Sequence, residues 1–243
     1  ADMVMERQTD VPPMVVPDWA HFITGGVDIQ ETSLYWSIRA WGPYITSQNI
    51  AHGQALSFQE IERIMNLPYL KENGDQLVVS LCLIDSGYDA DSTYDFCASN
   101  LDWAMPVKGS SNPMLSHFKI SKINRPESRA HGMTLVLTDG DKYKDMIAAR
   151  MKKENGKGSW MVYDGCDMDY AEQVTAEHKV NMKSGSRVIQ RWVQKQTHND
   201  NHYLDAEVYA MAAADILGVR TLHLEEKKAE EKTAAQEQYT PEE

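Results

Sequence analysis

The chain has 243 residues, of which 42% are hydrophobic and 25% are charged. These are ordinary values for a globular protein, and this length allows a sizeable core in one large domain or two small ones. The longest apolar runs have the length of a strand, so the sequence predicts no membrane-spanning helix, and the first residues show no signal-peptide pattern. Three scattered cysteines without metal-binding spacing favour a reducing compartment such as the cytosol.

The formal net charge of −12 at first argues against a nucleic-acid partner. However, residues 224–243 alone hold seven acidic residues and three lysines, a net charge of −4. Two other windows, 107–125 and 179–195, contain no acidic residue. Their basic residues are Lys108, Lys119, Lys122 and Arg125 in the first and Lys179, Lys183, Arg187, Arg191 and Lys195 in the second. An acidic protein with such basic windows can still bind a polyanion locally.

The first 21 residues contain three prolines, which favour a linker or an extended lead-in over a helix. Three short strands are predicted next, and the tight turns between them indicate an antiparallel meander. Their ranges are 22–30, 33–41 and 45–51. A helix follows, with Ser57 as its N-cap and Glu60 in the capping-box position.

A strand, a turn and a helix are predicted around Asp85. Residues 77–84 form an apolar run rich in β-branched side chains, which is typical of a buried strand. The strand ends at Asp85, a glycine turn follows, and residues 89–92 supply N-cap residues for a helix. Because such βα units place ligands at the carboxyl edge of a sheet, Asp85 is a candidate ligand, with an Asx-turn as the alternative.

The remaining elements complete an α/β pattern. They are strands at 103–108, 133–137 and 160–163, a helix after Gly140, a short helix at 170–178, a hairpin at 179–195 and a helix at 203–217. Gly218 is predicted to end the last helix. The domain is therefore expected to span 22–222, followed by a charged, disordered tail at 223–243.

Two further aspartates lie in unusual surroundings. Asp28 interrupts the first, otherwise apolar strand, where a charge is costly unless a cation meets it; pairing with a lysine or capping a turn are the alternatives. Asp205 lies in the first turn of the last helix, where the helix dipole favours an acid whatever its function. Glu207 is expected to face solvent. His202 is predicted as a cap, a structural donor or a ligand.

Carboxylates of this kind suit Mg²⁺ or Mn²⁺, which prefer hard oxygen ligands and leave room for water and phosphate. A pair of such ions can activate an attacking water and stabilise the leaving oxygen of a phosphodiester. Asp28, Asp85 and Asp205 are therefore candidate metal ligands, and the sequence pattern leaves open whether the fold brings the three together.

Four motifs resemble the nuclease domain of lambda-type phage terminase large subunits. They are Gly26–Gln30, Ile84–Tyr88 with Tyr94–Cys97, Val107–Gly109, and Asn201–Ala210, and the resemblance extends from about Phe22 to Gly218. It implies a ribonuclease H-like fold, a mixed sheet flanked by helices. It also implies that Asp28, Asp85 and Asp205 are the catalytic residues and bind two Mg²⁺ or Mn²⁺ ions, with Asp28 shared.

The resemblance implies an endonuclease that cuts concatemeric double-stranded viral DNA in the host cytoplasm, at the procapsid. Partners would be DNA, an upstream ATPase domain, the small terminase subunit and the portal. The chain lacks a GxxxxGK[ST] phosphate loop, so no ATPase is expected here. Expected DNA-backbone contacts are Lys108, Lys179, Lys183, Arg187, Arg191 and Lys195. Residues expected to support the metal ligands are Asp89, Asp91, Asn201 and His202.

Two alternatives stay open at this point. One is another ribonuclease H-like nuclease, of the junction-resolvase or integrase type. The other is a DNA- or portal-binding module without catalysis, in which the acids are structural.

Overall fold

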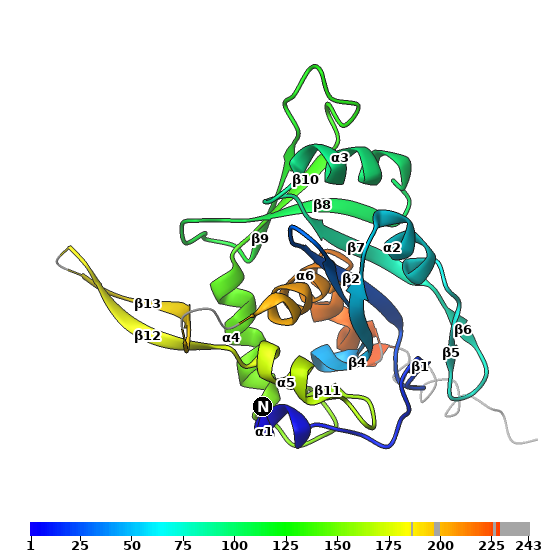
Figure 1. Ribbon diagram of the computed structural model, residues 1–243. Coiled ribbons are helices and arrows are strands. Elements are labelled where there is room, and N and C mark those ends of the chain that lie inside the picture. Colours follow the sequence, from blue (N-terminus) through cyan, green and yellow to red (C-terminus); the bar gives the residue numbers. More distant parts are fainter. Residues whose placement is uncertain (186, 197–199, 226, 229–243) are drawn as a thin grey trace, which may run out of the picture.

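The computed structural model describes residues 1–185, 187–196, 200–225 and 227–228, with the side chains of Ser184 and Arg187 outside that description. An eight-stranded mixed sheet forms the centre (Figure 1), in the order β11-β4-β3-β2-β7-β8-β10-β9. Its strands are β2 (Phe22–Ile29), β3 (Leu34–Gly42), β4 (Thr46–Ala55), β7 (Val79–Asp85), β8 (Ala104–Gly109), β9 (Phe118–Lys122), β10 (Thr134–Thr138) and β11 (Trp160–Val162). The expected meander is confirmed, because β2, β3 and β4 pair antiparallel. Beyond β2, the strands β7, β8 and β10 run parallel to it.

Helices cover both faces of this sheet. One face carries α4 (Gly140–Met151), α5 (Met168–Val174) and α6 (His202–Ile216), which share a hydrophobic cluster with inward side chains of the sheet. The other face carries α2 (Phe58–Met65) and α3 (Ala90–Ser99), with a second cluster beneath them. This mixed sheet between helices is the ribonuclease H-like arrangement that the sequence predicts. No described helix has the length and apolar character needed to cross a membrane.

The helix α6 lies directly on strand β2. A Cβ atom at Gly26 would stand 1.9 Å from the carbonyl oxygen of Ala206 and 2.6 Å from the backbone nitrogen of Ala210, so only glycine fits there. The Thr24 hydroxyl donates to the carbonyl of Ala210 at 2.7 Å. The helix faces the strand with small residues, and the two backbones therefore touch. Gly218 ends the helix region in the left-handed conformation, as predicted.

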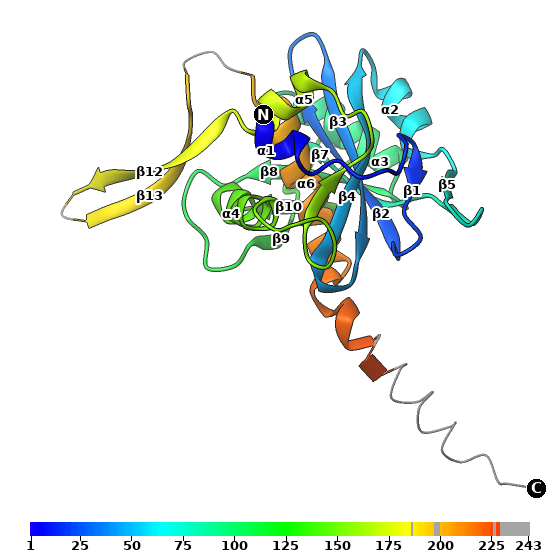
Figure 2. The same cartoon turned by 90° about the horizontal axis from the view of Figure 1, so that it is seen from below.

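A long hairpin, called the arm below, projects from the domain (Figures 1 and 2). It consists of β12 (Glu177–Ser184) and β13 (Arg187–Gln194), which pair antiparallel. The predicted hairpin is confirmed, but the predicted helix at 170–178 ends earlier. Asp167 caps α5 through the backbone nitrogen of Tyr170, and residues from Glu177 onward already belong to the arm.

The first 21 residues, interpreted from sequence as a lead-in, lie along the domain. They include α1 (Asp2–Met5) and β1 (Val15–Val16), and Val4 and Val16 are fully buried. The strand β1 pairs with β5 (Tyr69–Lys71), which pairs with β6 (Gln76–Leu77), in a small second sheet. Short segments η1 (Pro43–Ile45) and η2 (Val219–Thr221) complete the fold. The expected disordered tail falls mostly outside the described residues.

Candidate active site

Two of the three aspartates lie at the carboxyl-terminal ends of neighbouring parallel strands. Asp28 is near the end of β2 and Asp85 is the last residue of β7, and the register pairs Val27 with Ile84, one residue before each acid. Both are nearly buried, with 5% and 9% of their surface exposed. Asp205 comes from the first turn of α6, the helix that lies on β2. The fold therefore brings the three acids to one edge of the sheet.

The charge of Asp28 acts on both of the other carboxylates. Burial raises the pKa of Asp85 to about 6, and the charge of Asp28 contributes in the same direction. The pKa of Asp205 is also raised to about 6, first by desolvation and also by Asp28 and Glu177, against the lowering effect of Lys144. Tyr209 donates to Oδ1 of Asp85 at 3.4 Å. The site thus holds more negative charge than its protein cations balance.

A pH dependence of stability follows from these raised pKa values. Because Asp85 and Asp205 bind protons more tightly in the folded than in the unfolded state, the metal-free protein should lose stability as pH rises from about 4 to about 6. The loss for Asp85 alone is on the order of 3 kcal/mol. Thermal unfolding in EDTA across this range measures it. The variants Asp85→Asn and Asp205→Asn should each flatten the profile, and an unchanged slope in both would contradict the raised pKa values.

Each acid already has protein partners. Oδ2 of Asp28 accepts hydrogen bonds from Nε2 of Gln30 at 2.7 Å and from Nδ1 of His202 at 2.9 Å. The hydrogen bond to Asp28 raises the pKa of His202 above its ordinary value. Oδ1 of Asp85 accepts from the backbone nitrogen of Gly87 at 3.0 Å. His202 is thus a partner of a candidate metal ligand.

Lys144, Glu177 and Asn201 surround Asp205. Nζ of Lys144 lies 3.3 Å from Oδ1 of Asp205 and 2.7 Å from Oε1 of Glu177. Nδ2 of Asn201 donates to Oδ2 of Asp205 at 3.2 Å and to the same glutamate oxygen at 2.7 Å. Sequence reasoning identified Asn201 but missed Lys144 and Glu177, because they come from separate elements with no shared spacing.

The donor chemistry of the three aspartates fits Mg²⁺ or Mn²⁺, since all three offer hard carboxylate oxygens. Among the described residues, however, no three histidine, cysteine, aspartate or glutamate side chains are arranged to hold a metal ion as they stand. Two cationic or polar side chains lie beside these acids, with Nδ1 of His202 2.9 Å from Asp28 and Nζ of Lys144 3.3 Å from Asp205.

Asp89 and Asp91, expected near the metal ligands, have other roles. Asp89 caps α3 by accepting from the backbone nitrogen of Ser92 at 3.1 Å. Asp91 pairs with Arg125, and its side chain is 83% exposed. Asp89 thus has the helix-capping role that the sequence also predicts, and Asp91 lies at the surface in the first turn of the same helix.

Glu207, expected to face solvent, is fully buried. Its Oε2 pairs with Nε of Arg39 at 2.5 Å, and Arg39 is fully buried as well. Its other oxygen accepts from Ser37, Asn49 and Tyr170. Burial alone would raise the pKa of Glu207, but Arg39 and these hydrogen bonds lower it below the ordinary value. The prediction was wrong because α6 is enclosed by the sheet on one side and by α4 and α5 on the other.

The basic residues lie around this acidic edge. Lys108 is exposed on β8, one residue beyond Val107, which pairs with Asp85. On the arm, Lys179 pairs with Asp145 at 2.6 Å, and Arg191 lies 3.7 Å from Asp141. Lys183 and Lys195 are exposed, and the side chain of Arg187 lies outside the described part of the chain.

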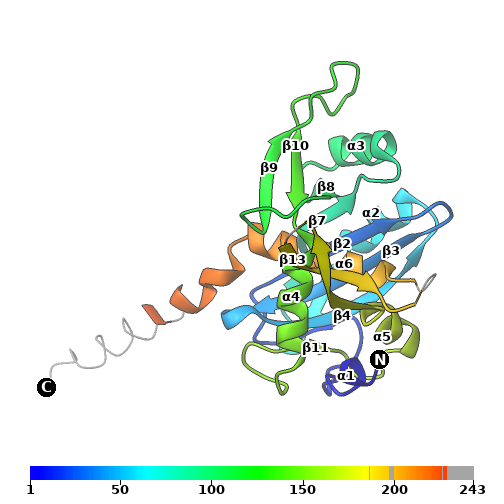
Figure 3. The same cartoon turned by 90° about the vertical axis from the view of Figure 1, so that its left-hand side faces the viewer.

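A cavity of about 320 Å³ connects the arm with the acidic edge. It lies between β8, the start of α4 and the arm, and Lys144, Arg191 and Asp205 are among the residues that line it. Figure 3 shows α4 and the arm in front of α6. Arg191 of the arm and Asp205 of the acidic edge therefore line the same cavity.

An antiparallel meander continued by parallel strands, with carboxylates on β2, β7 and α6, defines a ribonuclease H-like domain with an acidic centre. The family model described as the endonuclease domain of terminase large subunit gpA matches residues 1–227. The chain belongs to this terminase endonuclease-domain family. The match includes the first 21 residues, which agrees with their packing on the domain.

The terminase large subunit of Escherichia phage lambda is 26% identical over 230 residues, covering 88% of this chain and 35% of the lambda protein. The chain thus spans about a third of the length of that relative. No solved structure matches the chain.

Proposed function

We propose that this domain is a metal-dependent endonuclease that cuts concatemeric double-stranded DNA during viral genome packaging. The observation that carries the proposal is the meeting of three carboxylates at one sheet edge, with pKa values raised for Asp85 and Asp205. Such a surplus of negative charge favours divalent cations. Membership of the terminase endonuclease family supports the choice of DNA as substrate.

In this proposal, Asp28 and Asp85 hold one Mg²⁺ or Mn²⁺ ion, and Asp28 and Asp205 hold a second. When bound, the two ions supply activation of the attacking water and stabilisation of the leaving 3′ oxygen. The chain contributes the geometry: Asp28 and Asp85 are fixed by paired strands, and Asp205 by a helix in backbone contact with one of them. The products carry 3′-hydroxyl and 5′-phosphate ends.

DNA would be held by basic residues on both sides of the acids. Lys108 stands at the end of β8, and the arm contributes Lys183, Arg191 and Lys195. These side chains would contact phosphates, which position the duplex without reading its sequence. ATP hydrolysis would be carried out by another part of the whole terminase. We propose that the small subunit and the portal do not contact the acidic centre of this domain.

Cleavage of supercoiled plasmid tests the function. The domain should nick or linearise plasmid when Mn²⁺ or Mg²⁺ is present and lose this activity in EDTA, and adding the metal back should restore it. A protein that binds plasmid equally in both conditions without cutting it would favour the binding module. Strong preference for a four-way junction over linear duplex would favour the resolvase type.

The arm should determine part of the salt dependence of DNA binding. Replacing Lys183, Arg191 and Lys195 by glutamine removes up to three phosphate contacts, so the slope of log K against log salt should decrease by about two to three. Fluorescence anisotropy with a labelled duplex measures it. Glutamine at Lys119 and Lys122, two exposed residues of β9, is the matched comparison. An unchanged slope in the arm variant, with a lower slope in the β9 variant, would move the DNA path to β9.

A further inference from the structure

Both oxygens of Asp205 are held by donors that share one anchor. Lys144 reaches Oδ1 of Asp205 at 3.3 Å, and Asn201 donates to Oδ2 at 3.2 Å. Each of these donors also lies 2.7 Å from Oε1 of Glu177. The four groups form a closed ring, in which a single glutamate oxygen fixes the two donors that orient Asp205.

The ring is shielded from solvent. The side chain of Glu177 is 6% exposed and that of Lys144 is 12% exposed, whereas Asp205 is 30% exposed on the side of the cavity. Burial alone would lower the pKa of Lys144, but Asp205 and Glu177 raise it, so the lysine is charged. One ammonium group is therefore shared between two carboxylates.

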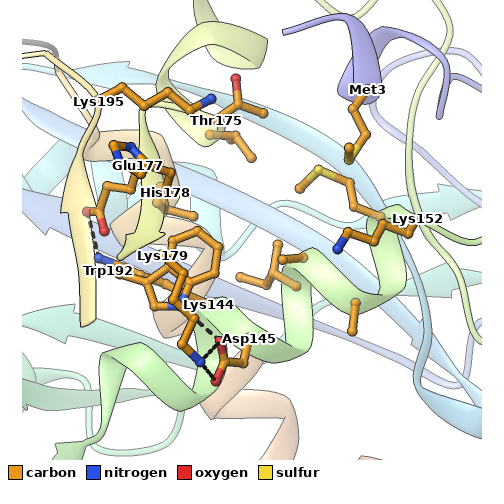
Figure 4. A pocket seen from close by; sticks show the side chains of 16 residues that line it. Met3, Lys144, Asp145, Lys152, Thr175, Glu177, His178, Lys179, Trp192 and Lys195 are labelled. Carbon is orange, nitrogen blue, oxygen red and sulfur yellow. Dashed lines mark hydrogen bonds and ion pairs between the residues drawn. The ribbon is translucent and has the colours of Figure 1, made fainter. Parts of the chain in front are cut away.

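The ring also joins three separate elements. Lys144 is on α4, Asn201 is the N-cap residue of α6, and Glu177 is the first residue of β12 at the base of the arm. Figure 4 shows Glu177 and Lys144 facing each other beside a groove of about 580 Å³. The adjacent residue of α4, Asp145, accepts from Lys179 and Trp192 of the arm. The arm base and the ring thus share one turn of α4.

We propose that Glu177 is a positioning residue of the nuclease, which orients Asp205 and holds Lys144 partly away from it. This inference rests on the metal-dependent function proposed above. Without the charge of Glu177, the Lys144 ammonium would have Asp205 as its only carboxylate partner in the ring. The resulting tighter ion pair would compete with a metal ion for Asp205. Glu177 thus keeps Asp205 available as a metal ligand, because it shares the Lys144 ammonium group that would otherwise neutralise Asp205.

Mn²⁺ titration of the DNA-free protein by calorimetry tests this inference. Glu177→Gln is nearly isosteric and should weaken Mn²⁺ binding by about 10- to 100-fold, the usual effect of residues behind a metal ligand. Lys144→Met should bind Mn²⁺ at least as tightly as the wild type, because the competing cation is absent. The double variant should regain most of the affinity lost in Glu177→Gln. Glu172→Gln, an exposed acid on α5, is the matched control.

Kinetics supply a second measurement. With saturating Mn²⁺, Glu177→Gln should lower kcat for plasmid cleavage, while KM for DNA stays unchanged because the phosphate contacts of the arm remain. If Glu177→Gln keeps the wild-type Mn²⁺ affinity and kcat, the inference about Glu177 is wrong and the proposed function still stands. Failure of Lys144→Met to rescue the double variant would also overturn it, since the lysine would not be the competitor. A wild-type protein that binds no Mn²⁺ would overturn the proposed function itself.

Discussion

Replacing Asp28, Asp85 or Asp205 by asparagine is expected to abolish Mn²⁺-dependent plasmid cleavage while leaving the fold intact. Residues behind a metal ligand typically change activity by about 10- to 100-fold, so loss of a ligand itself should cost about a hundredfold or more. Initial rates of plasmid nicking measure the effect.

The same asparagine variants should also show how crowded the acids are. Without metal, Asp85→Asn and Asp205→Asn should unfold at a higher temperature than the wild type at neutral pH, since each removes a carboxylate whose ionised form is disfavoured. Asp91→Asn, which alters an exposed acid paired with Arg125, is the control and should keep full activity. Full activity in any one of the three variants would remove that residue from the mechanism.

The second large effect is expected at Glu207. Glu207→Gln leaves the fully buried guanidinium of Arg39 without its counter-charge, which typically costs about 3–5 kcal/mol. For a domain of this size the midpoint of thermal unfolding should fall by about 10 °C. Because Glu207 lies two residues after Asp205 on α6, local loosening of the helix should lower activity as well.

A double variant separates the buried charge from the packing. Arg39→Met combined with Glu207→Gln removes both charges, so the pair should be less destabilised than the sum of the two single changes. Glu62→Gln, an exposed acid on α2, should leave the unfolding temperature unchanged. Additive effects at Arg39 and Glu207 would mean that the ion pair contributes no coupling and that Glu207 acts through its hydrogen bonds alone.

Local patterns were enough to predict the elements that carry the three aspartates. The strand ending at Asp85, the meander around Asp28 and the helix containing Asp205 each have their own periodicity and caps, so one sequence sufficed. The family resemblance then predicted their meeting, and the register of β2 and β7 places Asp28 and Asp85 as that prediction requires.

What the sequence could not predict depends on contacts between distant elements. Glu177 falls within the short helix predicted at 170–178. Nothing near it in the chain indicates that Lys144 and Asn201 will face it. Glu207 was misplaced because helical periodicity assumes one exposed face, whereas eleven of the fifteen residues of α6 are buried. Lys179 and Arg191 lie in a window without acids, yet α4 supplies acidic partners for both.

The contact between Gly26 and α6 has a consequence for how this domain can diverge. The separation between β2 and the helix is set by two main chains in direct contact, not by the volumes of side chains between them. Changes of core residues on the far face of the sheet can therefore alter stability without moving Asp205 relative to Asp28. A methyl group at Gly26, in contrast, should push β2 and α6 apart. It should therefore move Asp28 away from Asp205 although it adds no charge. The core on the far face of the sheet can therefore change in sequence while the spacing between Asp28 and Asp205 stays constant.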